Sequence, residues 1–195
     1  LDEEKPDYLT VAFDVHEPTF RHKIYSQYKG TRKPMPSELR EQVPLIQELL
    51  TAMGIKIVSK GGYEADDLLG TLAKKSEQKG MDVTILSGDR DLLQLATEKV
   101  MIRLPKTSKG KTTIEDFHGE QDEVLEHYQV TPSQIIELKA LMGDSADNIP
   151  GIPGVGEKTA TKLIVQYGSI ENAHDHLEGI KPNKAKESLR DHYDL

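Results

Sequence analysis

Cysteine is absent from all 195 positions of the sequence. Disulfide bonds and thiolate-ligated metal sites are therefore excluded, and the composition fits a reducing cytoplasm. The sequence also has no apolar run long enough to cross a bilayer and no signal-peptide pattern at its start. We therefore expect a cytoplasmic location and no membrane partner. Apolar residues make up 36% of the chain and charged residues 30%, which is polar but still allows a core.

The chain also lacks the excess of positive charge that is typical of nucleic-acid-binding proteins, since its net charge is −8. Eight clustered acids together carry a charge of −8, so the other residues of the chain have no net charge. The remainder is unevenly charged, because residues 21–33 hold five Lys or Arg and no acid. We call this segment the basic strip, and its local charge matters more for a nucleic-acid partner than the sum does.

Eight carboxylates occur in four short segments, and the first three segments adjoin apolar runs. Hard divalent cations such as Mg²⁺ take oxygen ligands, and two-metal phosphoryl chemistry requires several carboxylates at one place. The pattern therefore favours a metal site. The eight acids are Asp14, Glu64, Asp66, Asp67, Asp89, Asp91, Asp144 and Asp147.

Strand and helix patterns alternate in the first half of the sequence, which predicts an α/β fold with a mostly parallel sheet and flanking helices. Residues 18–36 are expected to form a long loop or a loosely helical excursion, and residues 106–111 a turn. The expected strands are residues 8–13, 55–58, 82–86 and 100–104, and the expected helices are residues 38–53, 65–79 and a helix beginning at 92–96.

After residue 110 the pattern changes to helices. Thr131, Pro132 and Gln134 suit the N-cap, the first turn and a capping box of one helix. Residues 157–167 read as another helix, closed by Gly168. We therefore expect an α/β core over residues 1–110 and an all-helical subdomain over 111–195.

The acid clusters are expected to meet at one edge of the sheet, because ligands in open α/β sheets gather beyond the carboxyl ends of the strands. Glu64 and Asp67 are three residues apart and share a helical face, as do Asp144 and Asp147 if that segment is helical. Acids at helix starts also complement the helix dipole, and for the Glu64 group alone this explanation is preferred. Four clusters on one edge favour metal.

The segment 151–158, Gly-Ile-Pro-Gly-Val-Gly-Glu-Lys, lies between two expected helices. Its glycines allow close approach of a partner and leave N–H groups at a helix start, where an anion is favoured. This is typical of a helix-hairpin-helix that holds one DNA strand by its phosphates without reading sequence. Lys158 and Lys162 add positive charge. An ordinary turn between helices is the alternative.

In the basic strip, Tyr25 and Tyr28 are interleaved with the cations Arg21, Lys23, Lys29, Arg32 and Lys33. Cations bind phosphate, and tyrosine rings stack on unpaired bases. A solvated flexible loop explains the strip, viewed alone, equally well.

Together these segments resemble the 5′-nuclease (flap endonuclease) family over essentially the whole chain, most closely the 5′→3′ exonuclease domains that bacterial repair polymerases carry at their N-terminus. The motifs occur in the family's order and are specific in combination. They are Val11-Ala12-Phe13-Asp14, Phe20-Arg21-His22, Tyr28-Lys29-Gly30-Thr31-Arg32, Gly62-Tyr63-Glu64-Ala65-Asp66-Asp67, Ser87-Gly88-Asp89-Arg90-Asp91-Leu92, Leu141-Met142-Gly143-Asp144 with Asp147-Asn148, and Pro153-Gly154-Val155-Gly156-Glu157-Lys158-Thr159-Ala160.

The resemblance implies a PIN-like core and a structure-selective 5′→3′ exonuclease and flap endonuclease that acts in replication and repair. Its substrates would be DNA with a 5′ flap, a nick or a single-strand/duplex junction, or primer RNA, in a bacterial, nucleoid-associated setting with a polymerase domain in the same chain. It implies two Mg²⁺ or Mn²⁺ ions on the eight acids and K⁺ at the hairpin. Lys29 and Arg32, with Arg21, would steer the scissile phosphate. The remaining nucleic-acid contacts would be Tyr25, Tyr28, Lys33, Gly154, Val155, Gly156, Lys158, Thr159 and Lys162.

The family opens with a strand carrying Ile-Asp-Gly and a following helix, and this sequence starts after that segment. We therefore expect unpaired sheet edges and a metal site short of one carboxylate. Three other functions stay open on the sequence. They are a DNA-binding module without catalysis, an α/β phosphatase or small-molecule hydrolase, and an RNA-directed nuclease of related fold.

Overall fold

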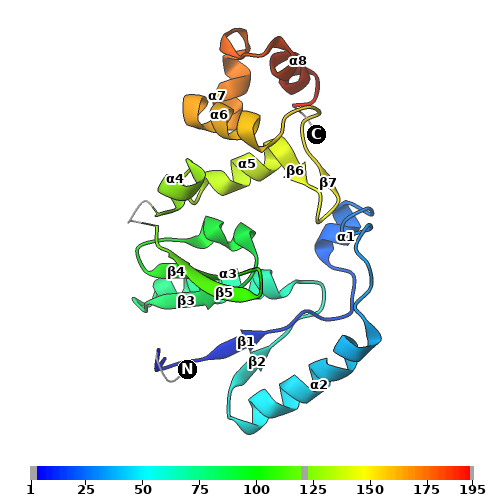
Figure 1. The fold of residues 1–195 in the computed structure, drawn as a ribbon, viewed down its shortest axis with the longest axis vertical. Coiled ribbons are helices and arrows are strands. Elements are labelled where there is room, and N and C mark those ends of the chain that lie inside the picture. The colour runs from blue at the N-terminus through cyan, green and yellow to red at the C-terminus, as the bar shows by residue number, and fades with distance from the viewer. Residues whose placement is uncertain (1–3, 120–122, 194–195) are drawn as a thin grey trace. The chain divides into compact units, whose positions relative to one another are not determined.

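The structure is a computed structural model of the chain, and it describes residues 4–119 and 123–193. The chain forms two compact units, residues 1–71 and residues 72–195, and each is described by itself. Figure 1 shows the order of their elements along the chain.

The first unit is built on two parallel strands joined through helices. β1 (Thr10–Ala12) pairs with β2 (Lys56–Val58), with Val11 opposite Ile57. Between them lie the short α1 (Phe20–Ile24) and the long α2 (Ser37–Ala52). Gly54 follows α2 with a φ of +74°, which a side-chain-free residue adopts at no steric cost. The predicted strands and the helix at 38–53 are confirmed.

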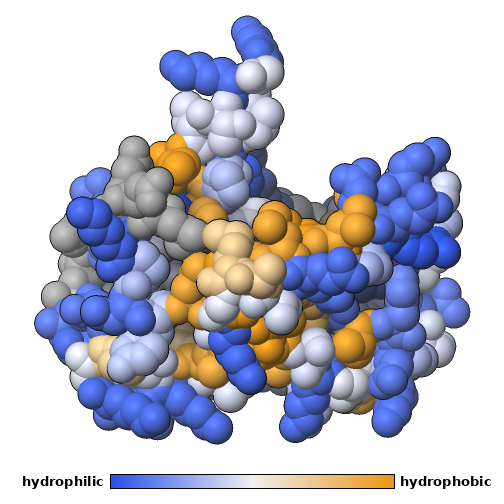
Figure 2. All heavy atoms as spheres, turned by 90° about the horizontal axis from the view of Figure 1, so that it is seen from below, coloured by the Kyte–Doolittle hydropathy of each residue, from blue (hydrophilic) through white to orange (hydrophobic). Residues whose placement is uncertain are grey.

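Helix α2 has the apolar spacing that the sequence indicates, yet none of its residues is buried. Figure 2, a view of the whole molecule from below, shows apolar side chains gathered across the middle of the surface that faces the viewer. Scattered exposed apolar residues are ordinary, whereas a contiguous group is unusual for a free surface. The exposed apolar side chains of this helix are Leu39, Leu45, Ile46 and Leu49, with Met53 at its end.

Helix α3 (Ala65–Glu77) leads into the second unit, whose sheet has the order β3 (Val83–Leu86), β4 (Val100–Ser108) and β5 (Lys111–Phe117). β3 is parallel to β4, with Ile85 opposite Ile102, and β5 is antiparallel to β4. The segment predicted as a helix from residue 92 is the 3₁₀ helix η1 (Arg90–Leu95). Ile102, Leu93 and Phe117 are buried at the centre of this unit.

The turn predicted over residues 106–111 is present but is limited to Lys109 and Gly110. β4 continues to Ser108, and a two-residue turn at Lys109 and Gly110, both at positive φ, starts β5. Such turns match the twist of the strands they join. Residues 111–117, the first after the expected domain boundary, are therefore a strand instead of part of a helical region.

The rest of the second unit is mainly helical. Its buried centre includes Leu141, Ile164 and Leu189. No helix in the described ranges is long and apolar enough to span a membrane. The elements are α4 (Glu123–Tyr128), α5 (Gln134–Met142), the pair β6 (Gly143–Asp144) and β7 (Ile149–Pro150), α6 (Glu157–Tyr167), α7 (Ile170–Asp175), η2 (Leu177–Gly179) and α8 (Asn183–Asp191).

The helix start predicted at Thr131 differs in detail from the structure. Residues 131–133 form a turn, and α5 begins at Gln134. The Gln134 side chain still accepts a hydrogen bond from the Thr131 backbone N–H at 2.9 Å, as the capping-box pattern predicts. Helix α6 has the predicted bounds.

Candidate functional site

The first group of acids surrounds the start of α3. Asp14 follows β1, and its Oδ1 accepts a hydrogen bond from the Ala65 backbone N–H at 2.6 Å. Asp67 reaches back to the Glu64 backbone N–H at 2.9 Å. Both carboxylates therefore satisfy N–H groups that have no partner within the helix, and the dipole of α3 favours their charge. The helix-dipole explanation preferred for the Glu64 group is realised in the structure.

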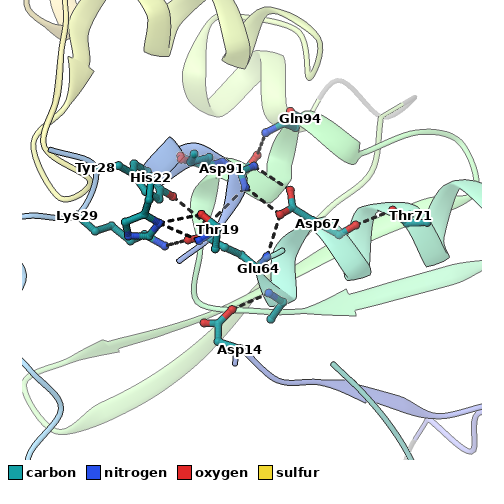
Figure 3. A network of polar contacts seen from close by, with 12 residues as sticks. Asp14, Thr19, His22, Tyr28, Lys29, Glu64, Asp67, Thr71, Asp91 and Gln94 are labelled. Atoms are coloured by element: carbon teal, nitrogen blue, oxygen red, sulfur yellow. Dashed lines mark hydrogen bonds and ion pairs between the residues drawn. The ribbon is translucent and has the colours of Figure 1, made fainter. Parts of the chain in front are cut away.

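Basic residues of the strip bind the same acids (Figure 3). The Arg21 guanidinium donates to both carboxylate oxygens of Asp67, each at 2.8 Å. The Lys29 ammonium lies 2.6 Å from one oxygen of Glu64, and the Tyr28 hydroxyl donates to the other at 2.9 Å. The Arg21 hydrogen bond holds the pKa of Asp67 below its ordinary value. Charge at the start of α3 is thus compensated by protein cations.

These contacts decide which residues of the basic strip are available to a ligand. Tyr28 is 4% exposed, and its ring lies edge-on to that of His22. The expected stacking of Tyr28 on an unpaired base is therefore wrong, because its ring is enclosed by the protein. Tyr25 is exposed, as are Arg32 and Lys33, so the nucleic-acid contacts predicted for these three residues stay predictions.

The second group of acids is gathered by one lysine of α5. The Lys139 ammonium lies 2.8 Å from Asp91 and 2.8 Å from Asp144. Asp89 caps η1, accepting a hydrogen bond from the Asp91 backbone N–H at 2.9 Å. Asp91 and Asp144, which are far apart in the sequence, thus lie against one ammonium group within this unit, and the meeting of all four acid clusters stays a prediction.

Environment moves the pKa values of these acids in opposite directions. Burial raises the pKa of Asp91, and the negative charges of Asp89 and Asp144 add to the rise while Lys139 opposes it. Burial alone raises the pKa of Asp144 too, but the Lys139 and backbone hydrogen bonds outweigh it and leave that pKa lowered. The pKa of Lys139 is raised, because its two acidic partners outweigh burial.

The segment from Asp144 to Asp147 is not helical, so the shared helical face considered for these two acids does not exist. It is the tip of the β6–β7 hairpin, where Asp144 Oδ1 accepts hydrogen bonds from the backbone N–H groups of Ala146 at 2.8 Å and Asp147 at 3.2 Å. Asp147 is half-buried in this hairpin, and Asp66 is half-buried in the first turn of α3.

The hairpin is closed by an unusually tight pair of glycines. A β-carbon on Gly151 would overlap the backbone of Met142 and Gly143, and it would lie 2.6 Å from the Leu141 carbonyl oxygen. Real β-carbons do not approach other atoms so closely. The position of Asp144 therefore depends on the absence of a side chain at residue 151.

The donor set fits a hard divalent cation, because all eight acids offer carboxylate oxygens. Within residues 4–119 and 123–193, however, no three or more His, Cys, Asp or Glu side chains are grouped closely enough to hold a metal ion. Protein cations, Lys139 above all, lie against the carboxylates instead. A metal ion that bound Asp91 Oδ1 and Asp144 Oδ2 would therefore compete with the Lys139 ammonium for those oxygens.

The segment 151–158 forms the predicted hairpin between helices. Gly154 has a φ of +77°, and Gly156 is the N-cap of α6. Val155 is buried, so what it offers a partner is its backbone. Lys158 and Lys162 are exposed on α6, four residues apart and so on one face, and Thr159 lies half-buried between them.

The sequence reasoning missed Lys139. It lies in α5, a segment that is otherwise mostly apolar, and a charged residue there needs a partner. The presence of a lysine in an apolar helix therefore indicates that it has an acidic partner, but which acids these are depends on the fold.

Grouped carboxylates and a glycine hairpin followed by the exposed Lys158 and Lys162 are features typical of proteins that bind the phosphate backbone of nucleic acids. Residues 1–129 match the family model of the 5′-3′ exonuclease N-terminal resolvase-like domain. Residues 130–195 match the model of the 5′-3′ exonuclease C-terminal SAM fold. The chain belongs to the 5′-3′ exonuclease family. The predicted family and the α/β core with its helical region are confirmed.

Relatives and solved structures agree with this assignment. The chain is 50% identical to DNA polymerase I of Bacillus caldotenax over 195 residues, which is 100% of this chain and 22% of that protein. It is 48% identical to DNA polymerase I of Bacillus subtilis (strain 168) over 194 residues, with the same coverage. It thus spans about a fifth of the length of these curated relatives.

A structure of bacteriophage T5 5′-exonuclease with divalent zinc ions bound is similar to this one. The TM-score is 0.78 at 25% identity, covering 99% of this chain and 72% of that chain. Another T5 flap endonuclease structure, a pseudo-enzyme-product complex with DNA and metal ions, has the same TM-score, identity and coverage.

Proposed function

We propose that the protein hydrolyses phosphodiester bonds of DNA at 5′ flaps, nicks or single-strand/duplex junctions, or of primer RNA, with two Mg²⁺ or Mn²⁺ ions. It would do so as the nuclease part of a bacterial DNA polymerase I, in the nucleoid-containing cytoplasm. The observation that carries the proposal is the convergence of Asp91 and Asp144 on a single cation, in a chain of the 5′-3′ exonuclease family.

The proposed metal ligands are the eight clustered acids. Bound divalent ions would supply a water of lowered pKa and Lewis-acid stabilisation of the phosphate. Two relatives of known structure support the metal assignment, because one has zinc bound and the other has metal ions with DNA. In this chain, Asp14 and Asp67 also hold the start of α3 in place, so they would fix the backbone that carries Asp66.

The cations of the basic strip have a second task in this proposal. Lys29 and Arg21 neutralise Glu64 and Asp67 through their ammonium and guanidinium groups. With those carboxylates held by a divalent ion, the Lys29 ammonium and the Arg21 guanidinium would be available to bind the substrate phosphate, together with Arg32. Charge on the phosphate grows in the transition state, and fixed cations stabilise it. The hairpin at 154–156 would hold the duplex by its backbone, with K⁺ on its carbonyls.

The substrate assignment is tested with four labelled DNAs at equal concentration in Mn²⁺: a 5′-flap duplex, the matching 3′-flap duplex, the flap strand alone and the blunt duplex. The proposal predicts products from the 5′-flap duplex near the junction, none from the 3′-flap duplex, and none after chelation of the metal. Equal cutting of all four DNAs would contradict structure selectivity.

A DNA-binding module without catalysis is the second candidate. The neutralisation of the described acids by Arg21, Lys29 and Lys139 favours it. Tight binding of the 5′-flap duplex with no product in Mg²⁺ or Mn²⁺ would support this candidate. A small-molecule hydrolase predicts neither binding nor competition by duplex DNA.

A further inference from the structure

The last helix of the chain is fastened to the hairpin at 154–156. The Ser188 hydroxyl of α8 donates a hydrogen bond to the Pro153 carbonyl oxygen at 2.6 Å, across 35 positions of sequence. Ser188 is 9% exposed, and its neighbours Ala185 and Leu189 are buried. One face of α8 therefore lies against the turn that precedes α6, and the position of that face is fixed by packing and by a hydrogen bond.

Lys184 lies on the same face of α8, because it precedes Ser188 by four residues, about one helical turn. Its side chain runs past the hairpin glycine. A β-carbon built on Gly154 would be 3.4 Å from Lys184 Cε and 3.9 Å from its Nζ. The ammonium group is therefore held beside the turn whose backbone the proposed function assigns to the DNA strand.

Among the three cations of α8, Lys184 differs in having no acidic partner within the described ranges 4–119 and 123–193. Lys186 on the same helix lies 2.6 Å from Glu178, and Arg190 lies 2.9 Å from Asp191. Lys184 is exposed, as are Lys158 and Lys162 of α6. Exposed cations that lack a protein counter-charge are the ones that gain most by neutralising phosphate, because they release bound counterions from the nucleic acid.

We propose that Lys184 of α8 binds a backbone phosphate of the DNA strand held at Gly154–Gly156, so that the nucleic-acid surface comprises α8 as well as the hairpin and α6. The inference rests on the proposed function of the hairpin and adds a third element to it. A phosphate contact positions the strand and carries no sequence information. Lys184 thus strengthens binding equally for all sequences.

The test measures fluorescence anisotropy of a labelled blunt DNA duplex with the whole chain, at several KCl concentrations and without divalent metal. The matched pair is Lys184→Ala and Lys186→Ala, which remove the same charge from the same helix. We expect Lys184→Ala to make the slope of log affinity against log salt less negative by about 0.9. We also expect it to weaken the affinity about 5- to 10-fold near 0.1 M salt. Lys186→Ala should leave the slope unchanged, and Lys184→Arg should retain it.

Three outcomes overturn the inference in distinguishable ways. Equal slopes for Lys184→Ala and the unaltered chain, with a reduced slope for Lys158→Ala, would remove Lys184 and leave the hairpin. Equal losses in Lys184→Ala and Lys186→Ala would show a general charge effect instead of a contact. No duplex binding by the unaltered chain would remove the hairpin function and Lys184 together. Thermal unfolding checks that each variant folds, and Lys184→Gln is measured in place of Lys184→Ala if that variant does not fold.

Discussion

Asp91 and Asp144 lie on either side of one ammonium group, that of Lys139, which is 2.8 Å from an oxygen of each. Three elements meet there, η1, α5 and the β6–β7 hairpin. The ammonium group of Lys139 thus neutralises two carboxylates from distant segments, as a bound cation would.

Replacing Lys139 with methionine should destabilise the protein at neutral pH, because it leaves two nearby carboxylates uncompensated. We expect a loss of about 1 to 2 kcal/mol in the free energy of unfolding. The loss is below that of a fully buried pair, since the Asp91 side chain is 37% exposed. Added Mn²⁺ should then raise the melting temperature of Lys139→Met more than that of the unaltered chain.

Calorimetry or dye-monitored melting, with and without Mn²⁺, measures the loss of stability and the shift in melting temperature. Lys186→Met is the control, since its partner Glu178 is almost fully exposed. Equal shifts with Mn²⁺ in Lys139→Met and the unaltered chain would show that the lysine does not occupy a metal position.

Replacing Gly151 with alanine should cost about 3 kcal/mol of unfolding free energy, in the upper range for an overpacked site. The reason is steric, because the new methyl group would overlap backbone atoms of Met142 and Gly143. Gly88→Ala is the control, since a β-carbon there meets nothing within 4 Å. Urea unfolding compares the two variants, and similar midpoints would mean that the β6–β7 hairpin yields more easily than its geometry indicates.

The hairpin of β4 and β5 should stabilise the protein in a pH-dependent way. Arg103 donates from Nε and Nη2 to the two carboxylate oxygens of Asp116, each at 2.7 Å, and this holds the pKa of Asp116 below its ordinary value. A lowered pKa in the folded state means that the contribution is complete above the unfolded value of about 3.9. The contribution is lost as the pH falls through the lowered pKa.

Arg103→Met should therefore lower the unfolding free energy by up to about 1 kcal/mol at pH 6, given the partial exposure of the pair. The difference from the unaltered chain should shrink below pH of about 4. Lys106→Met, which removes a more exposed pair with Glu115, serves as the control. A difference that stays constant from pH 6 to pH 3 would exclude the Asp116 carboxylate as its source.

The elements that the sequence predicted well are those whose ends are marked locally. Helix α6 has the predicted bounds because Gly156 and Gly168 mark both of its ends. The sequence does not reveal β5 because the polar run from Lys106 to Lys111, which contains Gly110, is typical of a turn. What makes this segment a strand is its pairing with β4, from Ser108 opposite Lys111 to Ile102 opposite Phe117.

The acidic residues were predictable by type and spacing, whereas their protein partners were not. Lys139 joins acids that lie far before and just after it in the sequence, and only the fold brings them together. Tyr28 shows the same limit, because alternation of tyrosines and cations does not reveal which ring is buried. Its hydroxyl instead serves Glu64, as part of the support for α3.

In the proposed function, the clustered carboxylates hold the metal ions with which the protein cleaves 5′ flaps. The most direct measurement is the rate of Mn²⁺-dependent cleavage of a 5′-flap duplex by the unaltered chain, Asp66→Asn and Glu41→Gln. Asp66→Asn keeps the shape of a proposed metal ligand, while Glu41→Gln removes an exposed charge from α2. We expect cleavage by the unaltered chain and by Glu41→Gln, and no cleavage by Asp66→Asn. All three proteins should bind the flap duplex. Unchanged cleavage by Asp66→Asn would contradict the proposed function.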